Sequence, residues 1–318
     1  MIGLMLVTGV FIVLAVFSGD KAERIRIGYL DDSLTGALLV LADLQDFFNA
    51  EKINVDITTY SSGNESLQDL DSGRLDMAAI PLTTLVYGGF GGGQYKIVAI
   101  LGSSENANRI IANKNIATIG DLKGKRIAAE EGTASHFFLD TVLRRKGMTM
   151  QDITFVDAPI AELPQMFERG DIDAFATRVL LARRTKSILE NSVVLRDPGA
   201  IEMFSALVVS DATIRERKED IYAVLRGLLA AENFSRSYSS QAITIVSRAG
   251  NFDNSFVFDL WQFLDLRVRL SERLSDLLEE RARWMLQAGI VENKQVPAFS
   301  SFVDASFLRE IKPDAVSF

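Results

Sequence analysis

Residues 121–136 read DLKGKRIAAEEGTASH, and no other stretch of the chain indicates the fold as clearly. The pattern predicts a turn, a short strand and a tight corner at Gly132-Thr133 that leads into a helix. The free N–H groups of that helix would point beyond the carboxyl end of the strand, which is where ligands bind in open α/β sheets. The stretch therefore predicts a strand–helix unit together with a place for a ligand.

The same alternation of strand and helix extends in both directions from this stretch, which predicts an α/β fold with helical crossovers. Strands are expected at 25–30, 53–59, 75–80, 95–101, 109–113, 126–129, 153–156 and 172–176. After a further strand at 203–209, apolar residues recur at three- and four-residue spacing as far as 288. This last part is expected to be helical packing scaffold.

Two short segments repeat one plan at equivalent places, LDSGRLDMA at 70–78 and FERGDIDAF at 167–175. Each reads as the end of a helix, a glycine and a strand, with an aspartate three residues after the glycine. Gly73 and Gly170 permit a left-handed stop after the helix, and Asp76 and Asp173 can tie down the start of the strand that follows. Because 318 residues also exceed the size of one ordinary core, two lobes of similar plan are predicted.

Composition excludes several classes of function. A formal net charge of −8 argues against a nucleic-acid partner, and the absence of cysteine removes thiol nucleophiles, thiolate metal sites and disulfides. There is no G-x-S-x-G, H-E-x-x-H or P-loop motif, and His136 is the only histidine. The glycine run at 88–93 follows a helix and precedes a strand, so it predicts a surface turn. We therefore expect no catalytic residue, no metal site and no cofactor, while a triad through His136 and chemistry by carboxylates alone stay open as alternatives.

Residues 1–19, MIGLMLVTGVFIVLAVFSG, carry no charge, and charged residues follow at once from Asp20 onward. As a helix this stretch is at the lower limit for crossing a bilayer, so a signal peptide and an uncleaved anchor both fit it. The signal peptide is the favoured interpretation, although the usual positive n-region is missing. Either way, the chain is expected to be exported.

For four residues the sequence leaves open whether they contact a ligand or have a structural role. Thr133 and Ser135 can either cap the predicted helix or contact a ligand, and the same choice applies to His136 in its first turn. Arg178, at the exit of a strand, offers bidentate donors to a carboxylate or sulfonate, or is a solvated residue at a helix start. If Arg178 and this helix start converge, the ligand is a small anion.

The motifs D-L-K-G-K at 121–125, Gly132-Thr133 and G-D-I-D-A at 170–174 together resemble the second lobe of ABC-importer solute-binding proteins. The group in question serves sulfonates, taurine, nitrate and thiamine precursors, and the resemblance covers about half of the mature chain. It implies a type II periplasmic binding protein fold, with two mixed sheets, flanking helices and a helical C-terminal region. Lobe 1 would comprise 24–112 and 204–318 and lobe 2 would comprise 113–203, with hinges near Asn113 and Met203.

The resemblance also implies which positions contact the ligand, because such contacts come from loops after the strands. Carried onto this sequence, they are Asp31, Asp32, Ser33, Ser62, Thr83, Thr84, Gly132, Thr133, Ala134, Ser135 and His136, with Arg178 in the segment after Asp173. In that last segment many relatives have an aromatic-acid-proline run, where this chain reads ATRV at 176–179. The departure leaves the identity of the ligand open.

The resemblance implies a binding protein rather than an enzyme. It would be a periplasmic monomer without a cofactor that captures a small organic solute and delivers it to an ABC permease, touching the membrane only through residues 1–19. Two alternatives remain. One is an enzyme of the same fold in thiamine-pyrimidine or menaquinone biosynthesis, against which the N-terminal segment argues. The other is a sensor domain anchored to the inner membrane, in which that segment would stay uncleaved.

Overall fold

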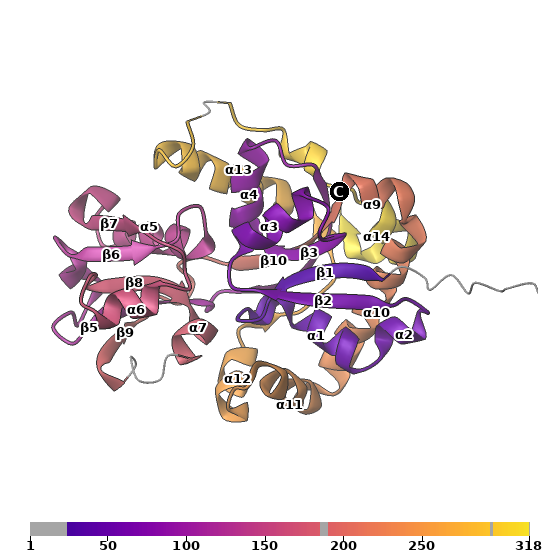
Figure 1. Cartoon of the computed structure of the whole chain (residues 1–318), viewed down its shortest axis with the longest axis horizontal. Coiled ribbons are helices and arrows are strands. Elements are labelled where there is room, and N and C mark those ends of the chain that lie inside the picture. The colour runs from indigo at the N-terminus through magenta and orange to yellow at the C-terminus, as the bar shows by residue number, and fades with distance from the viewer. Residues whose placement is uncertain (1–23, 185–189, 293–294, 318) are drawn as a thin grey trace, which may run out of the picture.

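The computed structural model describes residues 24–184, 190–292 and 295–317. Figure 1 shows these residues as two lobes, each organised around one β-sheet with flanking helices. The predicted export segment 1–19 lies outside the described residues. In the part of the chain that is described, no helix is both long enough and apolar enough to cross a membrane.

The first lobe contains a six-stranded sheet in the order β11-β4-β10-β3-β1-β2. Its strands are β1 (Ile25–Leu30), β2 (Val55–Tyr60), β3 (Met77–Pro81), β4 (Tyr95–Ser104), β10 (Met203–Ser210) and β11 (Leu264–Asp265). Every residue of β3 is buried, because neighbouring strands and helices cover it on all sides. This burial explains why the sequence of β3 is a continuous apolar run without alternation.

Most of the helices belong to the first lobe, and many come from the C-terminal third of the chain, as predicted. They are α1 (Ala37–Leu44), α2 (Phe47–Ala50), α3 (Gly63–Asp71), α4 (Leu82–Phe90), α9 (Asp211–Glu216), α10 (Lys218–Ser237), α11 (Ser239–Gly250), α12 (Asn254–Trp261), α13 (Arg273–Gln287) and α14 (Ser306–Ile311). In Figure 1, α4 and α13 lie above the sheet and α11 and α12 below it. A two-stranded parallel pair, β12 (Leu270–Ser271) with β13 (Val316–Ser317), ties the end of the chain to this lobe.

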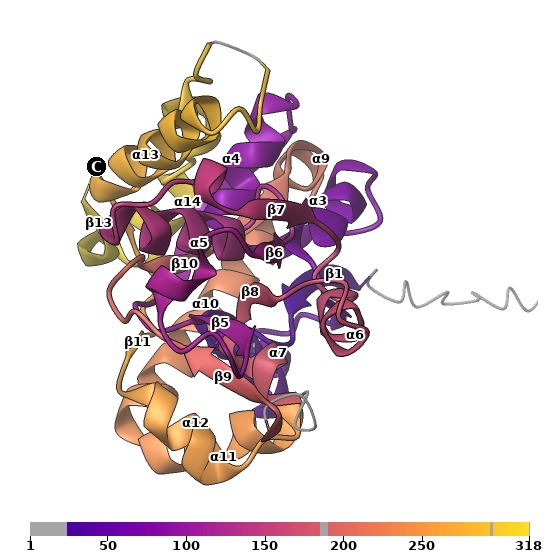
Figure 2. The ribbon, with the colours of Figure 1, turned by 90° about the vertical axis from the view of Figure 1, so that its left-hand side faces the viewer.

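The second lobe contains a five-stranded sheet in the order β7-β6-β8-β5-β9. Its strands are β5 (Asn108–Asn113), β6 (Arg126–Ala129), β7 (Thr154–Asp157), β8 (Ala174–Arg178) and β9 (Ser192–Leu195). Its helices are α5 (Ala134–Arg145), α6 (Leu163–Glu168) and α7 (Val179–Arg184). Figure 2 shows α7 on the side of this lobe that faces α11 and α12 of the first.

The two sheets follow the same plan, as the sequence repeat predicted. Three parallel strands, β2-β1-β3 in one lobe and β7-β6-β8 in the other, are extended by one antiparallel strand, β10 or β5. Gly73 and Gly170, which end the preceding helices, have φ angles of 73° and 75°. Both glycines therefore adopt the left-handed conformation that their positions in the repeat predicted.

The aspartates of the repeat hold a different strand from the one expected. Asp76 Oδ2 accepts a hydrogen bond of 2.8 Å from the backbone N–H of Arg26, and Asp173 Oδ2 accepts one of 2.9 Å from that of Arg126. Each arginine side chain also pairs with the same aspartate. The aspartate thus fixes the start of the neighbouring parallel strand, β1 or β6, rather than the start of the strand that follows it.

The chain passes between the lobes twice, and the first passage corrects the boundary expected at 112/113. β5 forms hydrogen bonds with β8 and β9, so its residues belong to the second sheet. The first passage therefore lies at 105–107, between β4 and β5, and the second at 196–202, directly before β10 begins at Met203. The apolar pattern of a strand indicates that it is buried. It does not indicate which of two similar sheets the strand joins.

Candidate functional site

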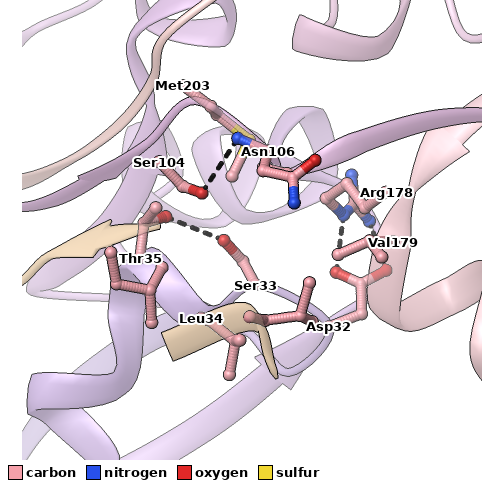
Figure 3. A pocket seen from close by; sticks show the side chains of 12 residues that line it. Asp32, Ser33, Leu34, Thr35, Ser104, Asn106, Arg178, Val179 and Met203 are labelled. Atoms are coloured by element: carbon pink, nitrogen blue, oxygen red, sulfur yellow. Dashed lines mark hydrogen bonds and ion pairs between the residues drawn. The ribbon is translucent and has the colours of Figure 1, made fainter. Parts of the chain in front are cut away.

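A small cavity lies where the two lobes meet, next to both passages of the chain. It has about 300 Å³ of unfilled space, including the part open to solvent, and about 10 Å³ of it can take the centre of a water molecule. That is room for about one water, so the lobes are closed on each other here. Figure 3 shows the lining, which is Asp32, Ser33, Leu34, Thr35, Ser104, Asn106, Ala107, Arg178, Val179, Met203, Leu260 and Leu264.

An ion pair between the lobes forms one wall of this cavity. Arg178, the last residue of β8, donates from Nε to Asp32 Oδ1 at 2.6 Å and from Nη2 to Asp32 Oδ2 at 2.7 Å. Its Nη2 also donates to the carbonyl oxygen of Ser61 at 2.5 Å. The two charged side chains are only 5% and 2% exposed. Each charge is therefore compensated by the other lobe, and separating the lobes would leave both unpaired.

The remaining polar groups of the cavity are partly satisfied. Ser33 and Thr35 share a hydrogen bond of 2.8 Å between their hydroxyls, and the N–H of Asn106 donates to Ser104 Oγ at 3.2 Å (Figure 3). Asn106 is 8% exposed, and its Oδ1 has no hydrogen-bond partner among the described residues. A buried amide oxygen without a partner is costly, so this atom is available to a donor on a bound molecule.

Glu130 makes a second polar contact between the lobes. Its Oε1 accepts hydrogen bonds from Ser62 Oγ at 2.5 Å and from Asn64 Nδ2 at 3.0 Å, both in the first lobe. Its Oε2 accepts from the N–H of Ile160 at 3.3 Å. Ser62 also caps α3. The predicted site residue Ser62 therefore lies at a contact between the lobes and outside the cavity lining.

The start of α5 packs close to the cavity without lining it. Thr133 caps the helix by accepting from the N–H of His136, and its hydroxyl donates to the carbonyl oxygen of Glu130 at 2.6 Å. Ser135 Oγ donates to Asn108 Oδ1 at 3.2 Å, and Ala134 packs against Ala107 and Met203. Thr133 thus caps the helix, which was one of the two roles considered for it. Ser135 instead contacts Asn108 of β5.

Gly132 is the point at which this corner touches the first lobe. Its φ angle is 73°, and a Cβ placed on it would lie 2.9 Å from the ring of Tyr87 in α4. Both the backbone conformation and this close approach require glycine.

His136 is a core residue. It is 3% exposed, stacks on Phe155 with ring centroids 4.6 Å apart, and meets the edge of Trp284 at 5.2 Å. Burial lowers its pKa to about 4, although Asp140 and Asp157 act in the opposite direction. It is therefore neutral at pH 7, and it belongs to the packing between α5, β7 and α13 rather than to the cavity lining.

Acidification should destabilise the protein through this one histidine. In the unfolded chain the imidazole takes up a proton near pH 6.5, whereas in the folded protein it does so only near pH 4. The unfolded state binds more protons in this window, so the free energy of unfolding should fall by up to about 3 kcal/mol between pH 6.5 and 4. Urea denaturation of wild type and His136→Phe at several pH values measures the effect. If the two proteins lose stability in parallel over this window, the assignment to His136 is wrong.

The other predicted site residues are placed as follows. Asp32, Ser33 and Arg178 line the cavity, whereas Asp31 pairs with Arg184 at 3.0 Å nearer the surface. Thr83 and Thr84 are buried in the first turn of α4, outside the lining. Sequence reasoning missed Leu34, Thr35, Ser104, Asn106, Ala107, Val179, Met203, Leu260 and Leu264. The polar run Ser103-Ser104-Glu105-Asn106, which begins two residues after the predicted strand 95–101, was a usable signal for two of them.

Within residues 24–184, 190–292 and 295–317, no group of three or more histidine, aspartate or glutamate side chains is arranged to hold a metal ion. The cavity lining supplies one carboxylate, one guanidinium, hydroxyls and an amide. These groups can form ion pairs and hydrogen bonds with a small polar molecule.

Comparisons with known proteins agree with this geometry. A profile of the family described as NMT1/THI5 like matches residues 35–240, more than half of the chain. A curated Escherichia coli protein named as an aliphatic sulfonates-binding protein is 25% identical over 243 residues, covering 74% of each chain.

Two solved structures have a similar fold. The alkanesulfonate-binding protein of Xanthomonas axonopodis pv. citri, bound to MOPS, has a TM-score of 0.75 at 18% identity and covers 88% of this chain and 98% of its own. The periplasmic nitrate-binding protein of Synechocystis has a TM-score of 0.71 at 13% identity and covers 92% and 88%. At these identities the likeness concerns the fold.

Proposed function

Because this chain belongs to the NMT1/THI5-like family, we propose that it is the solute-binding component of an ABC importer. Its solute would enter between the parted lobes and enlarge this cavity, which as it stands has room for about one water. Closure of the lobes on the solute would be the signal that the permease recognises. Relatives and structural neighbours named as sulfonate- and nitrate-binding proteins support this role. The chain would act by binding and release, without chemical change to the solute.

One observation supports the chemical class of the solute, namely the buried Arg178–Asp32 pair on the cavity wall. A simple anion that took Arg178 would leave the Asp32 carboxylate buried without a cation. An uncompensated buried charge costs several kcal/mol, so a purely anionic solute is disfavoured. A solute with one anionic and one cationic group would replace both partners of the pair at once. We therefore infer a small zwitterion.

The neighbouring groups of the cavity suit such a molecule. The unpartnered Asn106 Oδ1 can accept a hydrogen bond from an ammonium group, next to which Asp32 would supply the opposite charge. Arg178 offers two parallel donors that match the oxygens of a sulfonate or carboxylate. Leu34, Val179, Met203, Leu260 and Leu264 supply apolar surface for a short carbon chain.

The proposal also implies where in the cell the protein works. Neighbours described as periplasmic support an exported, periplasmic protein that meets the permease at the membrane surface. We infer that it works as a monomer and that residues 1–19 direct its export.

Matched compounds test the proposal by thermal shift. A ligand that binds only the folded state raises the melting temperature, so 2-aminoethanesulfonate should raise it more than ethanesulfonate or ethanolamine at equal concentration. Ethanesulfonate carries only the sulfonate and ethanolamine carries only the amine, so each control has one of the two charged groups. No shift with any aminosulfonate or amino acid of this size would contradict the proposed solute class.

A further inference from the structure

Arg109, the second residue of β5, is a buried cation without a matching anion. It is 3% exposed, and its Nη1 donates to the carbonyl oxygens of Asn106 at 3.1 Å and Asn108 at 2.6 Å. No carboxylate forms an ion pair with it among the described residues. A buried charge that is met only by carbonyl dipoles is energetically unfavourable, which makes the site receptive to an anion.

A second arginine, Arg196, lies close to it in the same pocket lining. The antiparallel register pairs Ile110 with Leu195, and Arg109 and Arg196 are the residues that follow this pair outward, with Arg196 just beyond the end of β9. Two like charges this close repel each other. Burial, together with the charge of Arg196, lowers the pKa of Arg109 to about 10. In the part of the chain that is described, no carboxylate forms an ion pair with Arg196 either.

On its other side Arg109 is opposed by Thr177 of β8. The Thr177 hydroxyl is fully buried and lacks a hydrogen-bond partner among the described residues. Directly opposed residues lie on the same face of a sheet, so Thr177 and Arg109 share one face of β8 and β5. A cation without a carboxylate partner and an unsatisfied hydroxyl therefore lie side by side, close to the first passage between the lobes.

A surface pocket is lined by both Arg109 and Arg196, and both lobes contribute to its walls. It has about 720 Å³ of unfilled space, including the part open to solvent. The second lobe supplies Arg109, Val179, Ala182, Arg183, Val194 and Arg196, and the first lobe supplies Ser255, Phe256 and Asp259 of α12. Arg183 forms an ion pair with Asp253 at 2.8 Å. Of the other charged groups in the lining, two are the arginines Arg109 and Arg196 and one is the carboxylate of Asp259.

We propose that this pocket binds a small doubly charged oxyanion, such as free inorganic phosphate or sulfate, between Arg109 and Arg196. Arginine is suited to this role because its planar donors match the spacing of oxyanion oxygens. The pocket is separate from the solute cavity, yet Val179 lines both. Because α12 forms part of the wall, an anion held there would favour the closed arrangement of the lobes. By linkage, it would then raise the affinity for the solute in the cavity.

Titration calorimetry with inorganic phosphate at fixed ionic strength tests the proposal on the full exported chain. Wild type should bind phosphate saturably in a 1:1 ratio, and Arg196→Ala should weaken binding at least tenfold, because a charge-assisted pair is lost. Arg196 is exposed, so this variant should fold normally. Arg215→Ala, which removes an exposed arginine of α9 far from the pocket, is the matched control and should bind as wild type does.

Two outcomes would overturn the proposal. Either wild type shows no saturable binding of phosphate beyond the effect of an equal ionic strength of chloride, or Arg196→Ala binds it as tightly as Arg215→Ala does. Arg109→Lys adds a second check, since it keeps the charge but loses the planar donors and should also weaken binding. None of these readouts depends on the solute of the interlobe cavity.

Discussion

Replacing Arg178 with methionine is expected to abolish binding of the solute in the interlobe cavity, with an affinity loss of at least a hundredfold. The variant removes the guanidinium of the cavity lining, so the sulfonate of the bound solute would be buried without its bidentate cationic partner. Breaking a buried pair in this way typically costs about 3–5 kcal/mol. That cost falls on the solute-bound closed state, because the sulfonate of the free solute is hydrated by water. Calorimetric titration with 2-aminoethanesulfonate measures the loss.

Arg184→Met is the matched control for this experiment. Arg184 also bridges the lobes, through Asp31, but the two side chains are 33% and 34% exposed. Exposed pairs contribute about 0–1 kcal/mol, so this variant should bind the solute nearly as wild type does. Equal affinities of wild type and Arg178→Met would remove Arg178 from the site.

Gly132→Ala is expected to weaken solute binding by about tenfold or more through a steric effect on closure. The added Cβ would lie 2.9 Å from the Tyr87 ring, which belongs to the opposite lobe. The left-handed backbone at this position adds a conformational cost of about 1–2 kcal/mol, whether the lobes are open or closed. Only the clash is specific to the closed state.

Gly124→Ala separates the two contributions. Gly124 has a φ angle of 71°, and a Cβ there would meet nothing within 4 Å. This variant should show a similar loss in the free energy of unfolding, measured in urea, with solute affinity unchanged. If Gly132→Ala and Gly124→Ala bind the solute equally well, the contact of Gly132 with Tyr87 does not limit closure.

Much of the fold could be predicted from the sequence, because it is encoded in local signals. The repeat around Gly73 and Gly170 marks equivalent places in two sheets of the same plan, and the left-handed glycines follow from it. Two features could not be predicted in this way. The aspartates of the repeat bond to a strand some fifty residues earlier in the chain, and β5 pairs with the second sheet rather than ending the first lobe. Both depend on contacts between distant segments.

The candidate site was predicted less completely, for a related reason. Residues at strand ends were singled out as candidates, and of these Asp32, Ser33 and Arg178 line the cavity. The start of α5 carries the same sequence signal, yet its polar groups are used within the protein, by the cap at Thr133 and the contact of Ser135 with Asn108. Ser104 and Asn106 lie beside the first passage between the lobes, whose position was not evident from the strand pattern.

The most direct test of the zwitterion cavity compares two solutes that differ by one amine. Wild type and Asp32→Asn are titrated calorimetrically with 2-aminoethanesulfonate and with ethanesulfonate. In wild type the aminosulfonate should bind at least tenfold more tightly, because only its ammonium can replace Arg178 as the partner of Asp32. In Asp32→Asn that preference should vanish, since the carboxylate that needs a cation is gone. A wild type that binds both solutes equally, or an Asp32→Asn variant that keeps the preference for the amine, would contradict the account.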